Sequence, residues 1–262
     1  MKAFSINSAL AFSTAMLATA ALHETGHALA AQALGFAPKI YAFYEDNPTG
    51  TAAQSLLILA AGPIVSLIAG LALAMWYRFT TPRYSYWRLL LFWLAWLGIM
   101  QFVNYLIVTP WLSAGDTAQM ADILRWPLWG RYAVSLAGIA ILIALLRPAA
   151  TSMFAAAPST IPLGDGRDRR RYIMAGFYLP LLAGVALTAV AGIGTNPVAV
   201  LLGLLGTLGN IDVIALALFR ANVAEVPVRA AGAPLRIEPV AIALWVAIVL
   251  FYVTLLPRGL SV

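Results

Sequence analysis

Residues 8–34 read SALAFSTAMLATAALHETGHALAAQAL, an apolar run that contains the only two histidines of the chain. The run is long enough to cross a bilayer, for which a helix needs about 20 predominantly apolar residues. Residues four apart share one helix face, so His23 and His27 can present both imidazoles to one metal ion. Glu24 lies about 100° around the helix from His23. There it can reach a water molecule held by that ion, an arrangement typical of zinc hydrolases.

The cost of burying these side chains favours a metal site over a chance occurrence of the motif. Each ionisable group costs on the order of 2–3 kcal/mol at the centre of a membrane unless it has a partner. One metal ion would be the partner of both histidines. The alternative is an accidental or purely structural pair of histidines.

The composition of the whole chain is that of a membrane protein. Of its 262 residues, 62% are hydrophobic and 10% are charged, whereas soluble domains carry about 25% charged residues. The absence of cysteine excludes disulfides and thiolate metal sites. Most of the basic residues lie in segments between apolar stretches, as juxtamembrane arginines do. The net charge of +6 therefore does not indicate a nucleic-acid partner.

The apolar stretches predict an all-α polytopic membrane protein with six or seven transmembrane helices. They cover residues 8–34, 52–76, 87–109, 132–146, 173–193, 198–219 and 240–256. The fourth stretch is short, which leaves six helices as the alternative to seven. After the first stretch, the β-prone segment Lys39–Tyr44 is bounded by Pro38 and by Asn47-Pro48 and predicts a short membrane-associated strand or hairpin.

A hydrolytic zinc site needs a third protein ligand and an open position. With no further histidine and no cysteine, that ligand must be a carboxylate. The candidates are Glu45, Asp46, Asp116, Asp122, Asp212 and the acidic residues of later loops. Asp116 is placed best, because it follows the third stretch and the helix-ending Pro110. Asp212 is its main rival, and a simple helix-capping role is the alternative for Asp116.

Three segments resemble the site-2 protease family of intramembrane zinc metalloproteases, over about residues 8–125. They are His23-Glu24-Thr25-Gly26-His27, then Ala61-Gly62-Pro63-Ile64-Val65, then Asn104, Pro110 and Asp116. The segment Phe36–Asn47 is similar to the family's membrane-associated β-element. Three departures stand out, and one of them is a spacing from Asn104 to Pro110 that is longer than in the family. Ser66 occupies the position of a usual asparagine, and Gly115 precedes Asp116 where the family has Asp-Gly.

The resemblance implies a site and a reaction. His23, His27 and Asp116 would bind Zn²⁺, Glu24 would activate water, and Asn104 would hold the substrate backbone or the oxyanion. Residues 1–130 would form the protease core and residues 131–262 would add further transmembrane helices. The substrate would be a transmembrane protein in the lipid bilayer, and the Lys39–Tyr44 strand would take up its extended segment by edge pairing. We expect a multi-pass protein of the prokaryotic cell (inner) membrane, without nucleic acid and of open oligomeric state.

Two other functions and two features of topology are weighed against this reading. A catalytically silent scaffold would lack Glu24, and a metal-handling transporter would carry more intramembrane acids than Asp212. A signal peptide at the N-terminus fits the sequence only loosely, because the run stays apolar beyond the cleavage position. The distribution of arginine places the N-terminus in the cytoplasm. The HETGH motif would then lie toward the outside, whereas the family has its site nearer the cytoplasm, and the orientation stays open.

Overall fold

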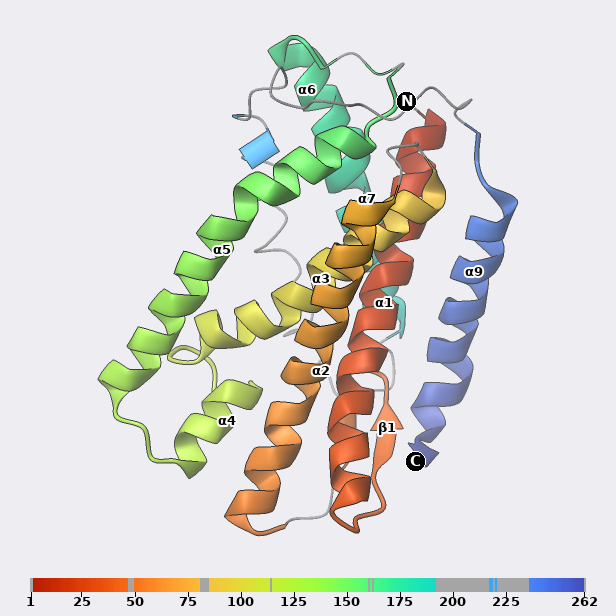
Figure 1. The fold of residues 1–262 in the computed structure, drawn as a ribbon. Helices are drawn as coiled ribbons and strands as arrows, with labels where there is room; N and C mark the ends of the chain where they lie inside the picture. Colours follow the sequence, from red (N-terminus) through yellow and green to blue (C-terminus); the bar gives the residue numbers. More distant parts are fainter. Residues whose placement is uncertain are drawn as a thin grey trace.

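The computed structural model describes residues 2–46, 50–80, 85–113, 115–159, 161, 163–191, 217, 218, 220 and 236–261. Within these residues, five helical segments are long and apolar enough to cross a membrane. They are α1 (Lys2–Ala33), α2 (Ala52–Phe79), α3 (Tyr86–Val108), α5 (Leu128–Ala156) and the run Pro239–Arg258. That run comprises α9 (Pro239–Leu250), η3 (Phe251–Leu255) and η4 (Leu256–Arg258). The chain is therefore a helical membrane protein (Figure 1).

The five described spans are fewer than the six or seven predicted. The fourth apolar stretch is part of a full-length helix, because α5 continues through Pro148 for 29 residues, as membrane helices tolerate. The fifth stretch, 173–193, is divided among α6 (Gly166–Ile173), the π-helical turn η1 (Met174–Tyr178) and α7 (Leu179–Ala191). The sixth stretch, 198–219, lies almost entirely outside the described residues.

Helices α1, α2 and α3 pack against one another and form the centre of the molecule. Their backbones approach closely where glycines meet. A Cβ on Gly70 of α2 would lie only 2.6 Å from the backbone nitrogen of Ile99 on α3. Small residues at such crossings let membrane helices come into direct van der Waals contact. Helix α5 packs on α3, while α7 and α9 pack on α1 (Figure 1).

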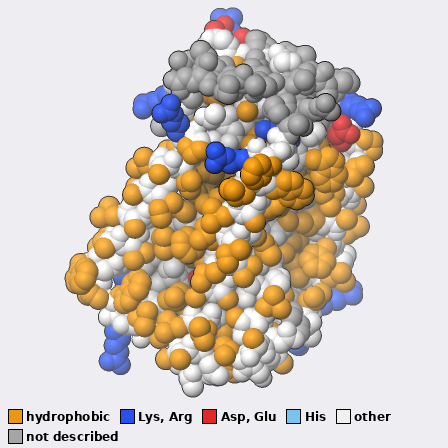
Figure 2. Space-filling model, viewed as in Figure 1, with side chains coloured by type: hydrophobic (Ala, Val, Ile, Leu, Met, Phe, Trp, Pro, Cys, Tyr) orange, Lys and Arg blue, Asp and Glu red, His pale blue; other side chains and the backbone are white. Residues whose placement is uncertain are grey.

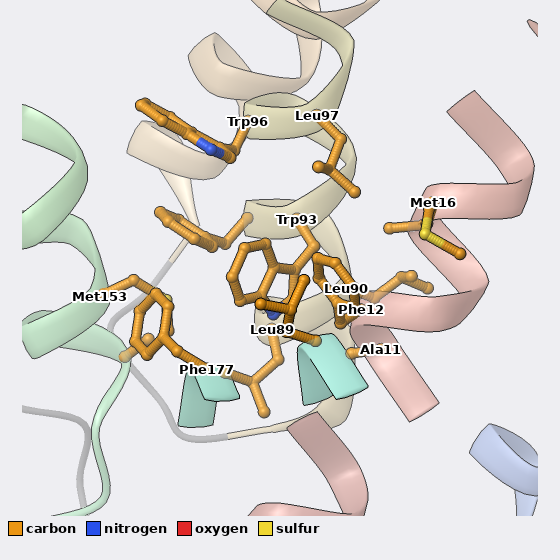
Figure 3. Close-up of a cluster of buried hydrophobic side chains, with 14 of the residues drawn as sticks. Ala11, Phe12, Met16, Leu89, Leu90, Trp93, Trp96, Leu97, Met153 and Phe177 are labelled. Atoms are coloured by element: carbon orange, nitrogen blue, oxygen red, sulfur yellow. The ribbon is translucent and has the colours of Figure 1, made fainter. Parts of the chain in front are cut away.

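An aromatic cluster holds the N-terminal half of α1 in this bundle. The fully buried Trp93 of α3 makes edge contacts with Phe12 of α1 at 4.8 Å and with Phe177 of η1 at 5.3 Å. Met153 and Leu89 close the cluster (Figure 3). Among the described residues on the visible face, hydrophobic side chains form a broad band, and Lys and Arg side chains lie mainly above and below it (Figure 2). This distribution is the one that a bilayer requires.

The short β-element after α1 is present as a hairpin. Strand β1 (Lys39–Tyr41) pairs antiparallel with β2 (Tyr44–Asp46), and Phe43 at the turn has a φ of 68°. A third strand, β3 (Leu260–Ser261), pairs antiparallel with the other side of β1, so the sheet order is β2-β1-β3. Both edges of β1 are therefore paired within the chain, and the expected pairing of Lys39–Tyr44 with a substrate stays a prediction.

Candidate metal centre

The three predicted ligands meet in a buried cluster. His23 and His27 project from α1, and Asp116 is the first residue of the short helix α4 (Asp116–Ile123). The Nε2 atoms of the two histidines are 3.1 Å apart. Oδ2 of Asp116 lies 3.1 Å from Nε2 of His23 and 3.3 Å from Nε2 of His27. All three residues are buried, with exposed fractions of 3%, 1% and 8%.

The tautomer of His27 is set by a backbone contact with α2. Its Nδ1 lies 2.7 Å from the carbonyl oxygen of Ile58. A carbonyl oxygen can only accept a hydrogen bond, so the imidazole proton is on Nδ1. The lone pair of Nε2 therefore points into the three-residue cluster, as a metal ligand must.

The tautomer of His23 is set by a relay of two side chains. The Ser66 hydroxyl on α2 donates to Oε1 of Gln101 on α3 at 2.8 Å. Its single hydrogen is thereby used, so the 3.3 Å contact with His23 is a bond from Nδ1–H to the Ser66 oxygen. The ring of His23 also stacks on Tyr105 at 5.2 Å, with the planes inclined by 10°. Ring position and tautomer are thus both determined, and Nε2 of His23 is again turned toward the cluster.

The atoms that face one another in this cluster fit a metal ion. With both Nδ1 atoms protonated, two nitrogen lone pairs and a carboxylate oxygen meet in a buried space, an arrangement that repels itself unless a cation is present. Two imidazoles and one carboxylate form a ligand set typical of catalytic zinc. Ligands held 2.0–2.1 Å from a tetrahedral zinc lie about 3.3 Å apart, close to the observed separations.

Two threonines hold Asp116 in place at the end of α3. The hydroxyl groups of Thr109 and Thr117 both donate to the carbonyl oxygen of Tyr105, at 2.7 and 2.6 Å. These bonds tie the first turn of α4 back onto α3. Gly115, which precedes Asp116, packs against the Tyr105 ring, where a Cβ would lie 3.3 Å from Cδ1. The reversed order Gly115-Asp116 is therefore compatible with a carboxylate directed at the histidines.

Glycine at two positions leaves room for the histidines at the crossing of α1 and α2. A Cβ on Gly26 would lie 3.0 Å from both Ala61 O and the α-carbon of Gly62. A Cβ on Gly62 would lie 2.6 Å from Cε1 of His27. The glycines of the first two sequence motifs thus serve one purpose, which is a close helix crossing with an imidazole between the backbones.

The other predicted site residues have different positions. Glu24 is buried on α1 with 8% exposure and lies beside His23 in the chain, outside the three-residue cluster. Asn104 is half-buried on α3, next to Tyr105. Asp122 forms an ion pair with Arg131 at 2.5 Å and is half-exposed, so it is not part of the cluster. Asp212 and the side chains of Glu45 and Asp46 lie outside the described residues.

Sequence reasoning did not assign a role to Gln101 or Tyr105 and treated Ser66 only as a departure from a motif. The spacing of polar residues in the third apolar stretch could have indicated Gln101 and Tyr105. Gln101, Asn104 and Tyr105 are spaced at i, i+3 and i+4, so they share one face of an otherwise apolar helix. Ser66 follows Gly62 by four residues on α2, and both positions face α1.

Comparisons of the chain with protein-family models, with curated proteins and with solved structures gave no match.

Proposed function

We propose that this chain is an intramembrane zinc metalloprotease of the kind that the site-2 protease resemblance implies. The observation that carries the proposal is the meeting of His23, His27 and Asp116 in a buried cluster, with both Nε2 lone pairs directed inward. A purely structural pair of histidines has no need of two separate contacts that hold the proton on Nδ1. Such contacts are the usual outer partners of metal-bound histidines.

The reaction is hydrolysis of a peptide bond. Zinc bound by these three residues would supply Lewis acidity toward a water molecule and the scissile carbonyl. Glu24 takes the proton of the attacking water and delivers it to the nitrogen of the leaving amine. The oxygen of the water becomes part of the new carboxylate. Asn104, on the α3 face that also carries Tyr105, holds the substrate backbone or the developing oxyanion.

The substrate class follows from the place of the site among apolar helices. A substrate reaches His23 and Asp116 from within the bilayer, so it is a transmembrane segment or the chain next to one. Peptide bonds inside a helix are shielded by their own hydrogen bonds, and the segment must therefore unwind before it is cleaved. An extended segment can pair with a strand edge, and the hairpin formed by β1 and β2 contacts α1, which carries the histidines.

The proposed core comprises α1 to α4 with the hairpin, and the later helices are additions to it. The boundary near residue 130 is the one expected from the sequence, and it stays a prediction. The prokaryotic cell membrane stays a prediction.

A comparison of wild type with Glu24→Gln tests the proposal. Both proteins are purified in detergent, their bound zinc is measured, and each is given a synthetic transmembrane peptide of about 25 residues. We expect both to contain one zinc per chain and only wild type to cleave. Glu238→Gln is the control, because Glu238 is a half-exposed acid at the start of α9. Equal cleavage by wild type and Glu24→Gln would rule out the mechanism, and metal-free protein would rule out the metalloenzyme.

A further inference from the structure

Strand β3 occupies an edge of β1, the strand that the sequence predicts to pair with an extended substrate segment. Ile40 pairs with Leu260 and Lys39 pairs with Ser261, while the opposite edge of β1 is taken by β2. In Figure 1 the end of the C-terminal helix returns to the side of β1, next to the lower half of α1. A segment of the same chain therefore lies where an extended peptide would pair.

The return of the chain onto β1 depends on Gly259. This residue has a φ of +74°, which other residues rarely adopt. A Cβ at this position would lie 2.9 Å from Cε1 of Tyr41. The Tyr41 ring in turn stacks on Tyr44 across the hairpin at 4.8 Å. Glycine thus lets the chain turn sharply after η4 and lie along β1.

The segment that leads into β3 also covers the Glu24 face of α1. Tyr252 of η3 is fully buried, and its hydroxyl donates to the carbonyl oxygen of Leu17 at 2.6 Å. Its ring lies 5.4 Å from Phe43 at the hairpin turn. Leu17 precedes Glu24 by seven residues, so the two lie on the same side of α1. One continuous segment therefore contacts the helix that bears the site, the turn of the hairpin and the edge of β1.

The pairing of β3 is short and exposed, which suits a contact that can be exchanged. The strand has two residues, both of them exposed, and the exposed fraction of Leu260 is 39%. A longer extended segment could pair with all three residues of β1. The backbone hydrogen bonds lost with β3 would then be replaced by equivalent bonds to the peptide.

We propose that β3 is a built-in competitor of the substrate, and that an extended substrate segment binds to the edge of β1 only after β3 has left it. This inference rests on the proposed protease function, because it names the regulation of that site. Release of β3 opens the edge, and return of β3 closes it.

A reversible disulfide tests whether β3 must leave. The chain contains no cysteine, so Lys39→Cys/Ser261→Cys introduces the only pair. The two positions are opposite in register and exposed, and directly opposite residues lie within reach of a disulfide. We expect the oxidised variant to cleave the synthetic transmembrane peptide at least about tenfold more slowly than the same sample after reduction. Ser261→Cys alone should give one rate before and after reduction. Equal rates for the locked and reduced double variant, or failure of the disulfide to form in membranes, would overturn the proposal.

Loss of β3 pairing should have the opposite effect. Leu260→Pro/Ser261→Pro removes both N–H groups of the strand, whereas Leu260→Ala/Ser261→Ala keeps them. We expect faster cleavage with the proline pair and a rate near that of wild type with the alanine pair. Unchanged cleavage with the proline pair would contradict a competing strand.

A binding measurement separates this inference from the proposed chemistry. In a Glu24→Gln background, capture of the same peptide through a photoreactive side chain reports binding without turnover. We expect capture to rise with the proline pair and to fall with the disulfide. If capture changes as expected with the proline pair and the disulfide, but the protein with Glu24 intact cleaves nothing, the protease function is rejected and the competitor is kept. If neither cleavage nor capture changes with these variants, only the competitor is rejected.

Discussion

The imidazole of His27 lies directly over the α-carbon of Gly62, in a space that any side chain at position 62 would fill. A Cβ on Gly62 would come within 2.6 Å of Cε1 and 2.7 Å of Cδ2 of that ring. Nδ1 of the same imidazole donates a hydrogen bond to the carbonyl oxygen of Ile58, one turn earlier on α2. Helix α2 therefore serves both as the wall against which the ring rests and as the acceptor that orients it.

Substitution of Gly62→Ala should displace His27 and weaken zinc binding. Overpacking of this kind costs about 1–3 kcal/mol, which corresponds to about 5- to 150-fold in affinity if the cost falls on the site. The measurement is zinc affinity by competition with a chelator, on protein shown to be helical by circular dichroism. Gly164→Ala is the control, since a Cβ there meets nothing within 4 Å. Equal zinc affinity for both variants would contradict the placement of His27.

Replacement of Asp116 should reduce zinc binding, whereas replacement of the other acidic residues should not. We expect Asp116→Ala to lose stoichiometric zinc, because two imidazoles alone leave the ion short of a protein ligand. Asp122→Ala removes a carboxylate from the same short helix, but one that is paired with Arg131, and it should retain the metal. Zinc retained in Asp116→Ala and lost in Asp212→Ala would reassign the third ligand.

The relay behind His23 should contribute to metal affinity without touching the metal. Ser66→Ala removes the acceptor of Nδ1–H on His23, and Gln101→Leu removes the group that orients the Ser66 hydroxyl. Loss of such outer partners costs about 10- to 100-fold in metal affinity or activity. Ser135→Ala is a matched control, because Ser135 is also a buried serine but donates to Ile107 O, on the α3–α5 interface. A loss of affinity as large in Ser135→Ala as in Ser66→Ala would indicate a general effect on folding.

A substrate or oxyanion role for Asn104 predicts a kinetic defect at full metal occupancy. Loss of one oxyanion donor lowers kcat by about 10²- to 10³-fold, so we expect Asn104→Ala to turn over slowly while it binds zinc normally. Tyr105→Phe keeps the aromatic ring that stacks on His23 and should stay active. Reduced zinc content in Asn104→Ala would show instead that Asn104 supports the fold of the site.

Zinc binding should weaken as the solution becomes acidic. A proton on Nε2 of His23 or His27 competes directly with the metal, so metal affinity should fall as the pH is lowered. An aspartate carboxyl is ordinarily ionised between about pH 7 and pH 5, so Asp116 should not contribute to this loss. Affinity measured across this range should therefore fall toward low pH, equally in wild type and Glu24→Gln. An affinity that does not change with pH would contradict ligation by the two imidazoles.

The local parts of this protein could be predicted from the sequence. Helical periodicity places His23 and His27 on one face, and hydropathy locates α1, α2, α3, α5 and the last span. Both depend on residues near one another in the chain. The hairpin after α1 was predicted for the same reason, since proline, asparagine and β-prone residues act locally. The length of α5 was missed because Arg147 and Pro148 interrupt the apolar pattern without ending the helix.

Only the tertiary structure decided which distant groups join these local parts. Asp116 reaches His23 across 93 positions of sequence, and it does so because close crossings at Gly26, Gly62 and Gly70 bring three helices together. The relay through Ser66 and Gln101 and the pairing of β3 with β1 have the same origin. Contacts of this kind depend on shape and close packing among helices, to which hydropathy and residue spacing are insensitive. The sequence by itself therefore determined the pair of imidazoles and the membrane helices, and packing decided which carboxylate meets the imidazoles, the supports of the histidines and the occupant of the strand edge.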